Sequence, residues 1–397
     1  DNQAKYPQLR FKGFTDPWVQ RKLTDVGDIA RGKSKHRPRN DKKLFGGKYP
    51  FVQTGDVASA GLFLTNYSQT YNEFGLAQSK LWPSGTLLIT IAANIAETSI
   101  LGIDAAFPDS VIGFTAKNSD VVFIKTLIDK FSNGLKRKAE TSSQANLNLA
   151  KLSDLDIVVP NYDEQKQISS FFQNLDNLIA ANQRKLDLLK EQKKGYLQKM
   201  FPKNEAKVPE LRFAGFADAW EQRKLGDLLK EFSIKSKIED EHKVLSSTNS
   251  GMEFREGRVS GTSNLGYKII KNGDLVLSPQ NLWLGNININ NIGKGLVSPS
   301  YKTFELINID SSFINPQLRT QKMLEEYKNS STQGASVVRR NLEIDSFYQI
   351  KILVPTISEQ EKIGSFFQQL DNTIVLHQRK LDLLKEQKKG FLQNMFV

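Results

Sequence analysis

Apolar side chains recur at alternating spacings of four and three residues in two long stretches of the chain, which indicates amphipathic helices. This spacing is typical of a coiled-coil seam. Asp163 and Ser358 are the expected N-caps, and Pro202 ends the first helix. A helix of about 37 residues is roughly 55 Å long. The apolar positions are Ile168, Phe172, Leu175, Ile179, Leu186, Leu189, Tyr196 and Met200, and then Ile363, Phe367, Leu370, Ile374, Leu381, Leu384, Phe391 and Met395.

The rest of the chain has short alternating or apolar runs separated by Gly, Asn, Pro and Ser, a pattern that predicts β-strands. Two helices are also expected, at residues 125–138 and 316–328. The content is therefore mixed α/β, in two blocks of ~130 residues, a size that suits an independent domain. The expected strands are residues 49–53, 67–70, 86–91, 121–124 and 155–159, and then 243–245, 273–278, 286–292, 303–307 and 349–354.

The chain contains an internal repeat in two places. Residues 164–201 recur at 359–396 with 28 of 38 positions identical, and residues 183–195 return unchanged as 378–390. A leading segment, LRFKGFTDPWVQRKLTD at 9–25, recurs as LRFAGFADAWEQRKLGD at 211–227. The blocks between these repeats, 27–158 and 228–352, share almost no identity. We therefore expect four parts: a leading segment with the first block (1–158), a long helix (159–203), a leading segment with the second block (204–353) and a second long helix (354–397).

Two equal repeats in one chain favour a pseudo-twofold arrangement in which the two helices pack antiparallel. The expected fold class is α+β. Two β-rich, mixed α/β domains would be separated by two long antiparallel helices that form an intramolecular coiled coil. In the alternative arrangement, each helix pairs with another subunit.

The amino-acid composition excludes several classes of functional site and favours one kind of binding partner. The chain has 397 residues, 55 Lys and Arg against 43 Asp and Glu, a net charge of +12, no Cys and three His. The lack of Cys excludes disulfides, thiolate zinc sites, iron–sulfur clusters and cysteine nucleophiles. The histidines lie far apart in sequence, so no metal site is expected. No apolar run approaches the roughly 20 residues of a membrane span, and residues 1–10 lack the apolar core of a secretory signal, so we expect a cytoplasmic protein. The basic excess favours a polyanionic partner.

One motif suggests nucleotide chemistry. Residues 27–34, GDIARGKS, match the phosphate-binding pattern G-x-x-x-x-G-K-[ST]. A phosphate-binding loop needs a buried strand before it and a helix that begins at the Lys and Ser. Here the preceding residues are mostly polar, Pro38 would interrupt such a helix, and the second copy lacks the motif. An ATPase acting through Lys33 is therefore the disfavoured enzyme alternative.

The sequence also lacks the signs of methyl-transfer chemistry. It contains no Asn/Asp-Pro-Pro-Tyr/Phe segment and no glycine-rich turn suited to a methyl-donor cofactor. We expect the chain by itself to be non-catalytic, without catalytic residues or a cofactor of its own.

Candidate DNA contacts fall into two groups. The first is a basic loop whose cations would contact phosphates and whose polar residues would reach base edges. The second is a set of polar turns at strand ends, because Asn and Gln suit adenine and Arg suits guanine. The alternatives are a solvated loop and ordinary turn chemistry. The loop candidates are Arg31, Lys33, Ser34, Lys35, His36, Arg37 and Arg39; the turn candidates are Thr54, Asp56, Asn94, Gln144, Asn146, Ser247, Thr248, Asn249, Gln280, Asn281, Tyr301, Arg339 and Arg340.

The duplicated EQxxIxxFFQxLDNxI and QRKLDLLKEQKKGxLQxMF helices, with the LRFxGFxxxWxQRKL leading segments, resemble the specificity subunit of type I DNA restriction-modification systems along the whole chain. The resemblance implies two target recognition domains, each of which reads one half of an asymmetric bipartite site in double-stranded DNA. It also implies that the helices set the spacer between the half-sites and dock the modification subunits. The helix residues Arg184, Lys185, Glu191, Arg379, Lys380 and Glu386 would then belong to a subunit interface.

The resemblance further implies the partners and their cofactors. Two modification subunits would carry S-adenosylmethionine for adenine methylation, and two restriction subunits would use ATP and Mg to translocate and cut DNA. The competing hypothesis is a coiled-coil structural or tethering protein without DNA sequence specificity.

Overall fold

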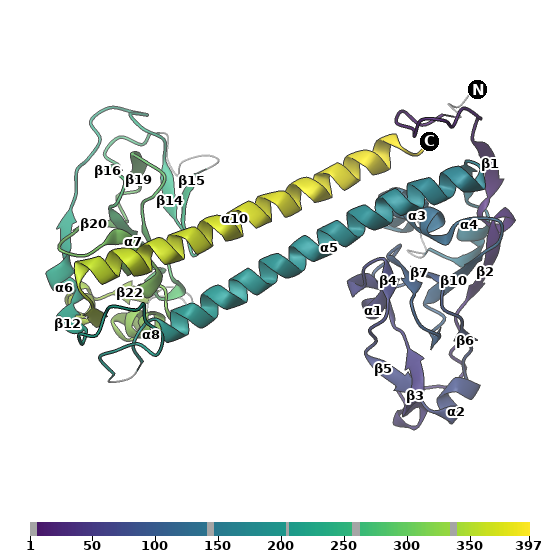
Figure 1. Cartoon of the computed structure of the whole chain (residues 1–397), viewed down its shortest axis with the longest axis horizontal. Coiled ribbons are helices and arrows are strands. Elements are labelled where there is room, and N and C mark those ends of the chain that lie inside the picture. Colours follow the sequence, from purple (N-terminus) through teal and green to yellow (C-terminus); the bar gives the residue numbers. More distant parts are fainter. Residues whose placement is uncertain (1–5, 141–146, 204–205, 256–262, 334–339) are drawn as a thin grey trace. The chain divides into compact units, whose positions relative to one another are not determined.

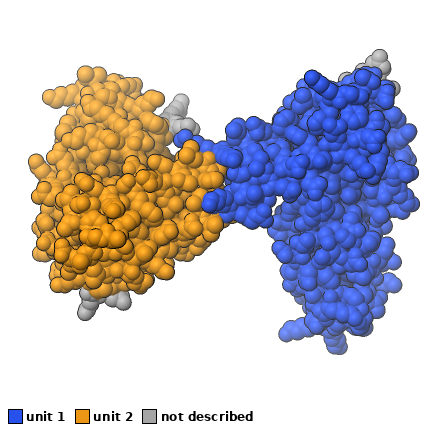
Figure 2. All heavy atoms as spheres, viewed as in Figure 1, with its two compact units in different colours: residues 1–185, 378–397 blue, residues 186–377 orange. Residues whose placement is uncertain are grey.

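The computed structural model describes residues 6–140, 147–203, 206–255, 263–333 and 340–397 (Figure 1). The chain divides into two compact units, shown in different colours in Figure 2. Unit 1 comprises Asp1–Lys185 and Gln378–Val397, and unit 2 comprises Leu186–His377. Each unit contains one leading segment, one β-rich block and a part of each long helix. The division into four sequence segments stays a prediction.

The block of unit 1 is built on two sheets. One has five strands in the order β2-β10-β7-β8-β4, and the other has four in the order β5-β3-β9-β6. Strands β3 and β5 and helix α2 lie at the end of unit 1 that is remote from α5 (Figure 1). The strands are β2 Gly27–Arg31, β3 Phe45–Phe51, β4 Phe63–Leu64, β5 Gln69–Tyr71, β6 Leu81–Trp82, β7 Leu87–Thr90, β8 Thr98–Leu101, β9 Ala105–Ala106 and β10 Val111–Ala116; the helices are α1 Thr54–Ser59, α2 Glu73–Ala77, α3 Val121–Glu140 and α4 Leu149–Ser153.

The strand expected at residues 121–124 is wrong, because these residues form the first turn of helix α3. Four consecutive apolar residues fit a buried strand and a buried helix equally well. Phe123, Ile124, Leu127 and Ile128 are all buried in the main core of unit 1, so the apolar run continues with helical spacing into the predicted helix. The helix therefore starts four residues earlier than residue 125.

Unit 2 carries a different set of strands. Its main sheet has the order β13-β20-β17-β18, and three two-stranded ribbons, β14-β15, β16-β19 and β21-β22, complete the block. The strands are β13 Leu229–Phe232, β14 Leu245–Ser247, β15 Met252–Phe254, β16 Lys268–Ile270, β17 Leu275–Leu277, β18 Ile287–Ile289, β19 Gly295–Val297, β20 Lys302–Leu306, β21 Ser331–Gln333 and β22 Arg340–Leu342; the helices are α6 Leu225–Leu228, α7 Ser311–Gln317, α8 Gln321–Asn329 and α9 Ile344–Gln349.

The single helix expected at residues 316–328 is instead two helices. Helix α7 contains Pro316 and ends at Gln317, and α8 begins at Gln321. Asp310 caps α7, and its carboxylate accepts hydrogen bonds from the backbone N–H groups of Ser312 and Phe313. Pro316 has no backbone N–H to continue the hydrogen-bond pattern, and α7 ends one residue after it.

The two long helices are α5, Tyr162–Lys199, and α10, Ile357–Asn394. The expected N-caps, Asp163 and Ser358, are displaced by two residues. In α5 the side-chain oxygen of Asn161 accepts from the backbone N–H of Glu164 at 2.9 Å, and in α10 the carbonyl of Thr356 accepts from the N–H of Gln360. Asn161 takes the cap because its amide oxygen reaches the third backbone N–H of the helix.

Within each unit the two helices pack antiparallel, which confirms the expected α+β fold class with its antiparallel helix pair. In unit 1 the ring of Phe171 in α5 meets Phe391 in α10 at 4.9 Å between centroids, and Lys388 lies 2.6 Å from Asp176. In unit 2 Tyr196 meets Phe366 at 5.0 Å, and Lys193 lies 2.5 Å from Asp371. The same contacts are thus formed with the roles of the helices exchanged.

In both units the leading segment contributes one β-strand, which pairs with the strand that precedes the long helix. Strand β1, Val19–Lys22, pairs with β11, Asp156–Val159, and β12, Glu221–Lys224, pairs with β23, Lys351–Val354. Trp18 and Trp220 are both 1% exposed. Trp18 packs on Phe123 and Phe396, and Trp220 packs on Phe313 and Phe201. The two units therefore share one framework and carry unlike sheets.

Candidate nucleic-acid interface

The basic loop connects β2 to β3 in unit 1, and its five arginine and lysine candidates, Arg31, Lys33, Lys35, Arg37 and Arg39, are all exposed. The loop is attached to the fold at several points. The hydroxyl of Ser79 donates to the carbonyl of Lys33 at 2.7 Å, and the backbone N–H of Lys35 donates to the carbonyl of Gln78 at 3.0 Å. The bond between Arg37 and Pro38 is cis. The cations therefore project from an anchored backbone.

Asp109 interacts with three arginines, Arg31, Arg37 and Arg39. The guanidinium of Arg39 lies 2.6 Å from the carboxylate of Asp109, and that of Arg37 lies 3.8 Å from it. The guanidinium of Arg31 donates a hydrogen bond to the backbone carbonyl of Asp109 at 2.9 Å. The side chains of Arg37 and Arg39 are about half exposed and that of Asp109 is 30% exposed, so each ion pair is weak. A phosphate group can therefore replace Asp109 as the partner of an arginine at small cost, whereas Lys33 and Lys35 are exposed without such a carboxylate nearby in the described interactions.

A contact between His36 and Asp41 links two positions within the basic loop. Nε2 of His36 lies 2.9 Å from the carboxylate of Asp41. The backbone N–H of Lys43 donates to the same carboxylate, and together with His36 it lowers the pKa of Asp41. The ring of His36 also meets the exposed ring of Phe74 at 5.6 Å. His36 is therefore already engaged within the protein.

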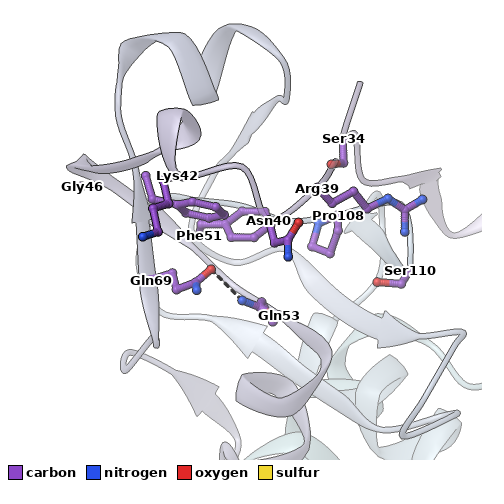
Figure 3. A pocket seen from close by; sticks show the side chains of 11 residues that line it. Ser34, Arg39, Asn40, Lys42, Gly46, Phe51, Gln53, Gln69, Pro108 and Ser110 are labelled. Atoms are coloured by element: carbon purple, nitrogen blue, oxygen red, sulfur yellow. Dashed lines mark hydrogen bonds between the residues drawn. The ribbon is translucent and has the colours of Figure 1, made fainter. Parts of the chain in front are cut away.

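A cavity of about 690 Å³ lies beside this loop. Figure 3 shows its lining, with Ser34, Arg39 and Asn40 from the loop and Gln53 and Gln69 from the ends of β3 and β5. Phe51 lines it from β3 and stacks on Tyr71 at 4.0 Å. Burial raises the pKa of Tyr71, whose hydroxyl interacts with Ser34. The cavity thus combines amide, hydroxyl, aromatic and cationic groups.

The phosphate-binding pattern at residues 27–34 does not form the geometry that its letters suggest. Gly27–Arg31 are the strand β2 itself, and no helix begins at Lys33 or Ser34 in this described segment. A Cβ at Gly32 would lie 2.3 Å from the carbonyl oxygen of Pro108, so this glycine is required by close packing against that backbone. The lysine has no helix N-terminus beside it with which to hold a phosphate.

The remaining described candidates of the first block lie in helix α1 and in the loop between β7 and β8. Thr54 is the first residue of α1, and Asp56 lies in the same helix. The carboxylate of Asp56 accepts from the backbone N–H of Gln53 at 2.8 Å and from the hydroxyl of Ser68 at 3.1 Å. Asn94 is exposed in the loop between β7 and β8, where Ala93 and Ala96 have φ of 52° and 58°. Gln144 and Asn146 lie outside the described residues.

Several candidates of the second block are used inside the fold. Ser247 is 2% exposed, and its hydroxyl donates to the carbonyl of Val276 and accepts from Asn288 at 2.8 Å. The guanidinium of Arg340 donates to the carbonyls of Ser331 and Lys328 at the end of α8. The hydroxyl of Ser247 and the guanidinium of Arg340 are therefore engaged within the protein.

The other candidates of the second block are nearer the surface. Thr248 closes a turn through Gly251, and the hydroxyl of Tyr301 lies 3.5 Å from the carbonyl of Ser247. Asn249 and Gln280 are exposed, Asn281 is half-buried, and Arg339 lies outside the described residues. Unit 2 therefore offers amide side chains at its surface.

The six candidates for a subunit interface, Arg184, Lys185, Glu191, Arg379, Lys380 and Glu386, are all exposed on the long helices. Two leucines of the duplicated segment are also exposed. Leu188 is 52% and Leu383 is 59% exposed, whereas the seam residues Leu186 and Leu381 are each 1% exposed. The pattern of apolar positions at spacings of four and three does not include Leu188 and Leu383, so the sequence analysis missed them.

Two findings concern other classes of site. The described residues contain no cluster of three or more His, Cys, Asp or Glu side chains arranged to hold a metal ion. None of the helices in the described part of the chain combines the length and apolar character that a membrane crossing requires.

Comparison with known proteins defines the class. A family model described as type I restriction modification DNA specificity domain matches residues 15–191 and 217–386, which together make up most of the chain. The chain therefore belongs to this family, and the family expected from the duplicated motifs is confirmed. Each of the two matched segments includes one block and most of one long helix.

Individual relatives agree with the family. The type I restriction enzyme MjaVIII specificity subunit of Methanocaldococcus jannaschii is 21% identical, over 98% of this chain and 94% of its own length. The MjaIX specificity subunit of the same organism is 24% identical over 54% of this chain, which spans 52% of that relative. A third relative from this organism is matched over 60% of its length.

Solved structures share the fold. The S subunit of a type I restriction-modification system from M. genitalium has a TM-score of 0.65 at 16% identity and is covered to 99%, as is this chain. A chain from a study of complex assembly and conformational transition of a type I R-M system has a TM-score of 0.54 at 13% identity, with 96% of this chain and 97% of that chain covered.

Proposed function

We propose that this chain selects the DNA sequence for a type I restriction-modification complex, and that the block of each unit reads one half of an asymmetric, bipartite site. One observation carries the proposal. The framework contacts are repeated in both units, while the sheets differ, with five and four strands in unit 1 and a four-stranded sheet with three ribbons in unit 2. Two unlike readers on one repeated framework favour two unlike half-sites over a palindrome.

The charge supports DNA as the ligand. The chain has a net charge of +12, and the exposed cations of the loop between β2 and β3 supply sequence-independent affinity for phosphates. Amide side chains at the cavity and at the surface turns of unit 2 supply groups for base edges. In this proposal the chain itself performs no chemistry.

The test is to co-express the chain with its matching modification subunits in a host without DNA methylation and to map methylated adenines across the genome. We expect a single bipartite motif with two unlike halves. A complex that assembles and leaves the genome unmethylated, or that methylates without sequence preference, contradicts the proposal. The latter outcome favours a tethering protein.

We further propose that the long helices dock two copies of one modification subunit. The segment 183–195 is repeated without change as 378–390, so each helix offers the same side chains to a partner. Arg184, Leu188 and Glu191 follow one another at spacings of four and three and therefore share a face of α5. On this face the side chain of Leu188 is more than half exposed, as is that of Leu383 on the equivalent face of α10. An exposed leucine between charged neighbours suits a protein interface.

In this proposal the partners supply the cofactors. The modification subunits bind S-adenosylmethionine for adenine methylation, and two restriction subunits, where present, use ATP and Mg. Leu188→Asp should reduce the number of bound modification subunits from two to one, and the double variant with Leu383→Asp should bind none. Leu178→Asp is the matched control, because Leu178 is 44% exposed on the same helix but lies outside the segment 183–195 that is repeated without change. Mass measurement of the complex distinguishes these states, and full occupancy in the double variant would exclude this docking face.

A further inference from the structure

A pair of glutamines lines the cavity of unit 1. Gln53 follows β3, Gln69 begins β5, and the two strands pair antiparallel with Phe51 opposite Gln69. The amide nitrogen of Gln53 donates to the amide oxygen of Gln69 at 2.8 Å, as the dashed line in Figure 3 marks. Gln53 is half-buried and Gln69 is exposed, so the pair is held at the surface of the cavity.

The hydrogen bond within the pair fixes what the pair presents to a ligand. Each amide has one carbonyl oxygen and one NH2 group. The bond uses one of the two N–H groups of the donating amide and one of the two lone pairs of the accepting oxygen, so the carbonyl oxygen of the donating side chain and the whole NH2 group of the accepting side chain stay available. If the oxygen and nitrogen positions are exchanged in the amides of both glutamines, the hydrogen bond runs in the opposite direction. One carbonyl oxygen and one NH2 group are then still available to a ligand. The pair therefore presents an acceptor beside a donor.

In the major groove this combination matches one base. Adenine presents N7 as an acceptor beside the N6 amino group as a donor, whereas guanine presents two acceptors, cytosine a donor and thymine an acceptor with a methyl group. We propose that Gln53 and Gln69 together read an adenine in the half-site of unit 1. The inference rests on the proposed function of the chain and names the residues that determine one position of its specificity.

The surroundings of the pair fit an A·T base pair. Phe45 and Phe51 line the same cavity and provide an apolar surface of the kind that contacts a thymine methyl group. Arg39 and Lys42 also line the cavity and supply the positive charge that holds a DNA backbone. The adenine that is read must differ from the methylated adenine, because the N6 atom of the latter has to be free for the modification subunit.

Asp56 positions the pair. Its carboxylate accepts from the backbone N–H of Gln53 at 2.8 Å and from the hydroxyl of Ser68, the neighbour of Gln69, at 3.1 Å. The carboxylate therefore connects the two chain segments that carry the glutamines. Asp56, a candidate for direct base contact in the sequence analysis, is assigned a positioning role here.

The test uses the assembled complex with its modification subunits. The wild-type motif is mapped first, and duplexes with each of the four bases at every position of both half-sites are then compared for binding. The wild type should prefer adenine at one unmethylated position by roughly 5- to 150-fold. Gln69→Leu should abolish this preference and leave the opposite half-site unchanged. Replacing both glutamines by Glu leaves acceptors only, which should move the preference toward cytosine.

The matched control is Gln8→Leu, because Gln8 is an exposed glutamine of the same unit that does not line the cavity. Asp56→Asn should weaken the adenine preference, and Gln69→Leu should leave thermal stability unchanged because the side chain is exposed. An unchanged preference in Gln69→Leu, or a wild-type half-site without any adenine beyond the methylated one, overturns the inference while the proposed function stands. A wild-type complex without any motif overturns the proposed function itself.

Discussion

The guanidinium of Arg10 donates two hydrogen bonds, each 2.7 Å long, to the carboxylate of Glu164, whose side chain is 1% exposed. The pair joins the leading segment to the first turn of α5. Arg212 and Glu359 form the same pair in unit 2, again with two bonds of 2.7 Å. The buried carboxylate raises the pKa of each arginine through the hydrogen bonds and its charge. The two pairs are therefore equivalent parts of the repeated framework.

Removing Arg10 should destabilise unit 1, because Glu164 would be left as an unpaired buried charge. We expect Arg10→Ala to cost about 3 kcal/mol of unfolding free energy. Hydrogen exchange should show lost protection at the start of α5. Arg212→Ala is the matched control, since it should have the same effect at the start of α10 instead. Equal loss of protection in both helices from either variant would contradict this assignment.

The antiparallel helix pair can be tested by cross-linking, since the chain has no native Cys. Asp176→Cys with Lys388→Cys places two thiols at side chains that lie 2.6 Å apart in the native ion pair. A short bifunctional thiol reagent should join them within one chain. A mixture of the two single variants provides the control, and it should give no product. Dimers from the double variant would show instead that each helix pairs with another subunit.

The basic loop should control the salt dependence of DNA binding. Each phosphate contact that is lost lowers the slope of log affinity against log salt by about 0.9. Lys33→Ala with Lys35→Ala should therefore lower the slope by about 2, and the half-site sequences should stay unchanged. Lys12→Ala with Arg21→Ala is the control, because these exposed cations lie in the leading segment. A slope equal to that of the wild type would mean that the loop is merely solvated.

The helices should set the length of the DNA spacer. One heptad adds about 10 Å to a helix, which equals about three base pairs of DNA at 3.4 Å each. Inserting one heptad into both α5 and α10, outside the segments 183–195 and 378–390 that carry the proposed docking face, should lengthen the spacer of the methylated motif by about that amount. Both half-sequences should be retained. An intact complex with the original spacer would contradict this role of the helices.

Unit 2 should lose stability at alkaline pH through Tyr348. Burial, together with its hydrogen bond to Glu231, raises the pKa of Tyr348 to about 12. A raised folded-state pKa contributes stability that is present below pH 10, the ordinary pKa of tyrosine, and is lost as the pH rises toward 12. This group should cost about 1 kcal/mol between pH 9 and pH 11. Tyr348→Phe should remove that part of the decline, and denaturant titrations at both pH values measure it. Parallel declines in the two proteins would contradict it.

Much of the framework could be predicted because its signals are local in sequence. The heptad spacing identified both long helices, and the repeat identified the equivalence of the two leading segments. The caps and the first turn of α3 were misplaced for local reasons as well. Asn161 and Asp163 are both residue types that favour the N-cap, and the helix begins at the earlier one; the apolar run at 121–124 suits strand and helix equally.

The candidate site depended on contacts between residues distant in the chain. Gln69 gave no signal in the sequence, and it meets Gln53 only because the hairpin of β3 and β5 pairs Phe51 with Gln69. Asp56 and Ser247 looked like base readers because they are polar residues in turns. The fold uses the carboxylate of Asp56 to hold two backbone segments together and buries the hydroxyl of Ser247 against Asn288.

The sequence by itself determined the two helices, the duplication, the basic excess and the family, because periodicity and repetition are properties of the chain alone. Only the tertiary structure decided which polar side chains form hydrogen bonds within the protein and which stay available to a ligand. Hydrogen-bond satisfaction depends on partners that sheet pairing brings from elsewhere in the chain, as Ser68 and Gln53 come to Asp56. The same residue type can therefore hold the fold together or stay available to a ligand, and its neighbours in space make that distinction.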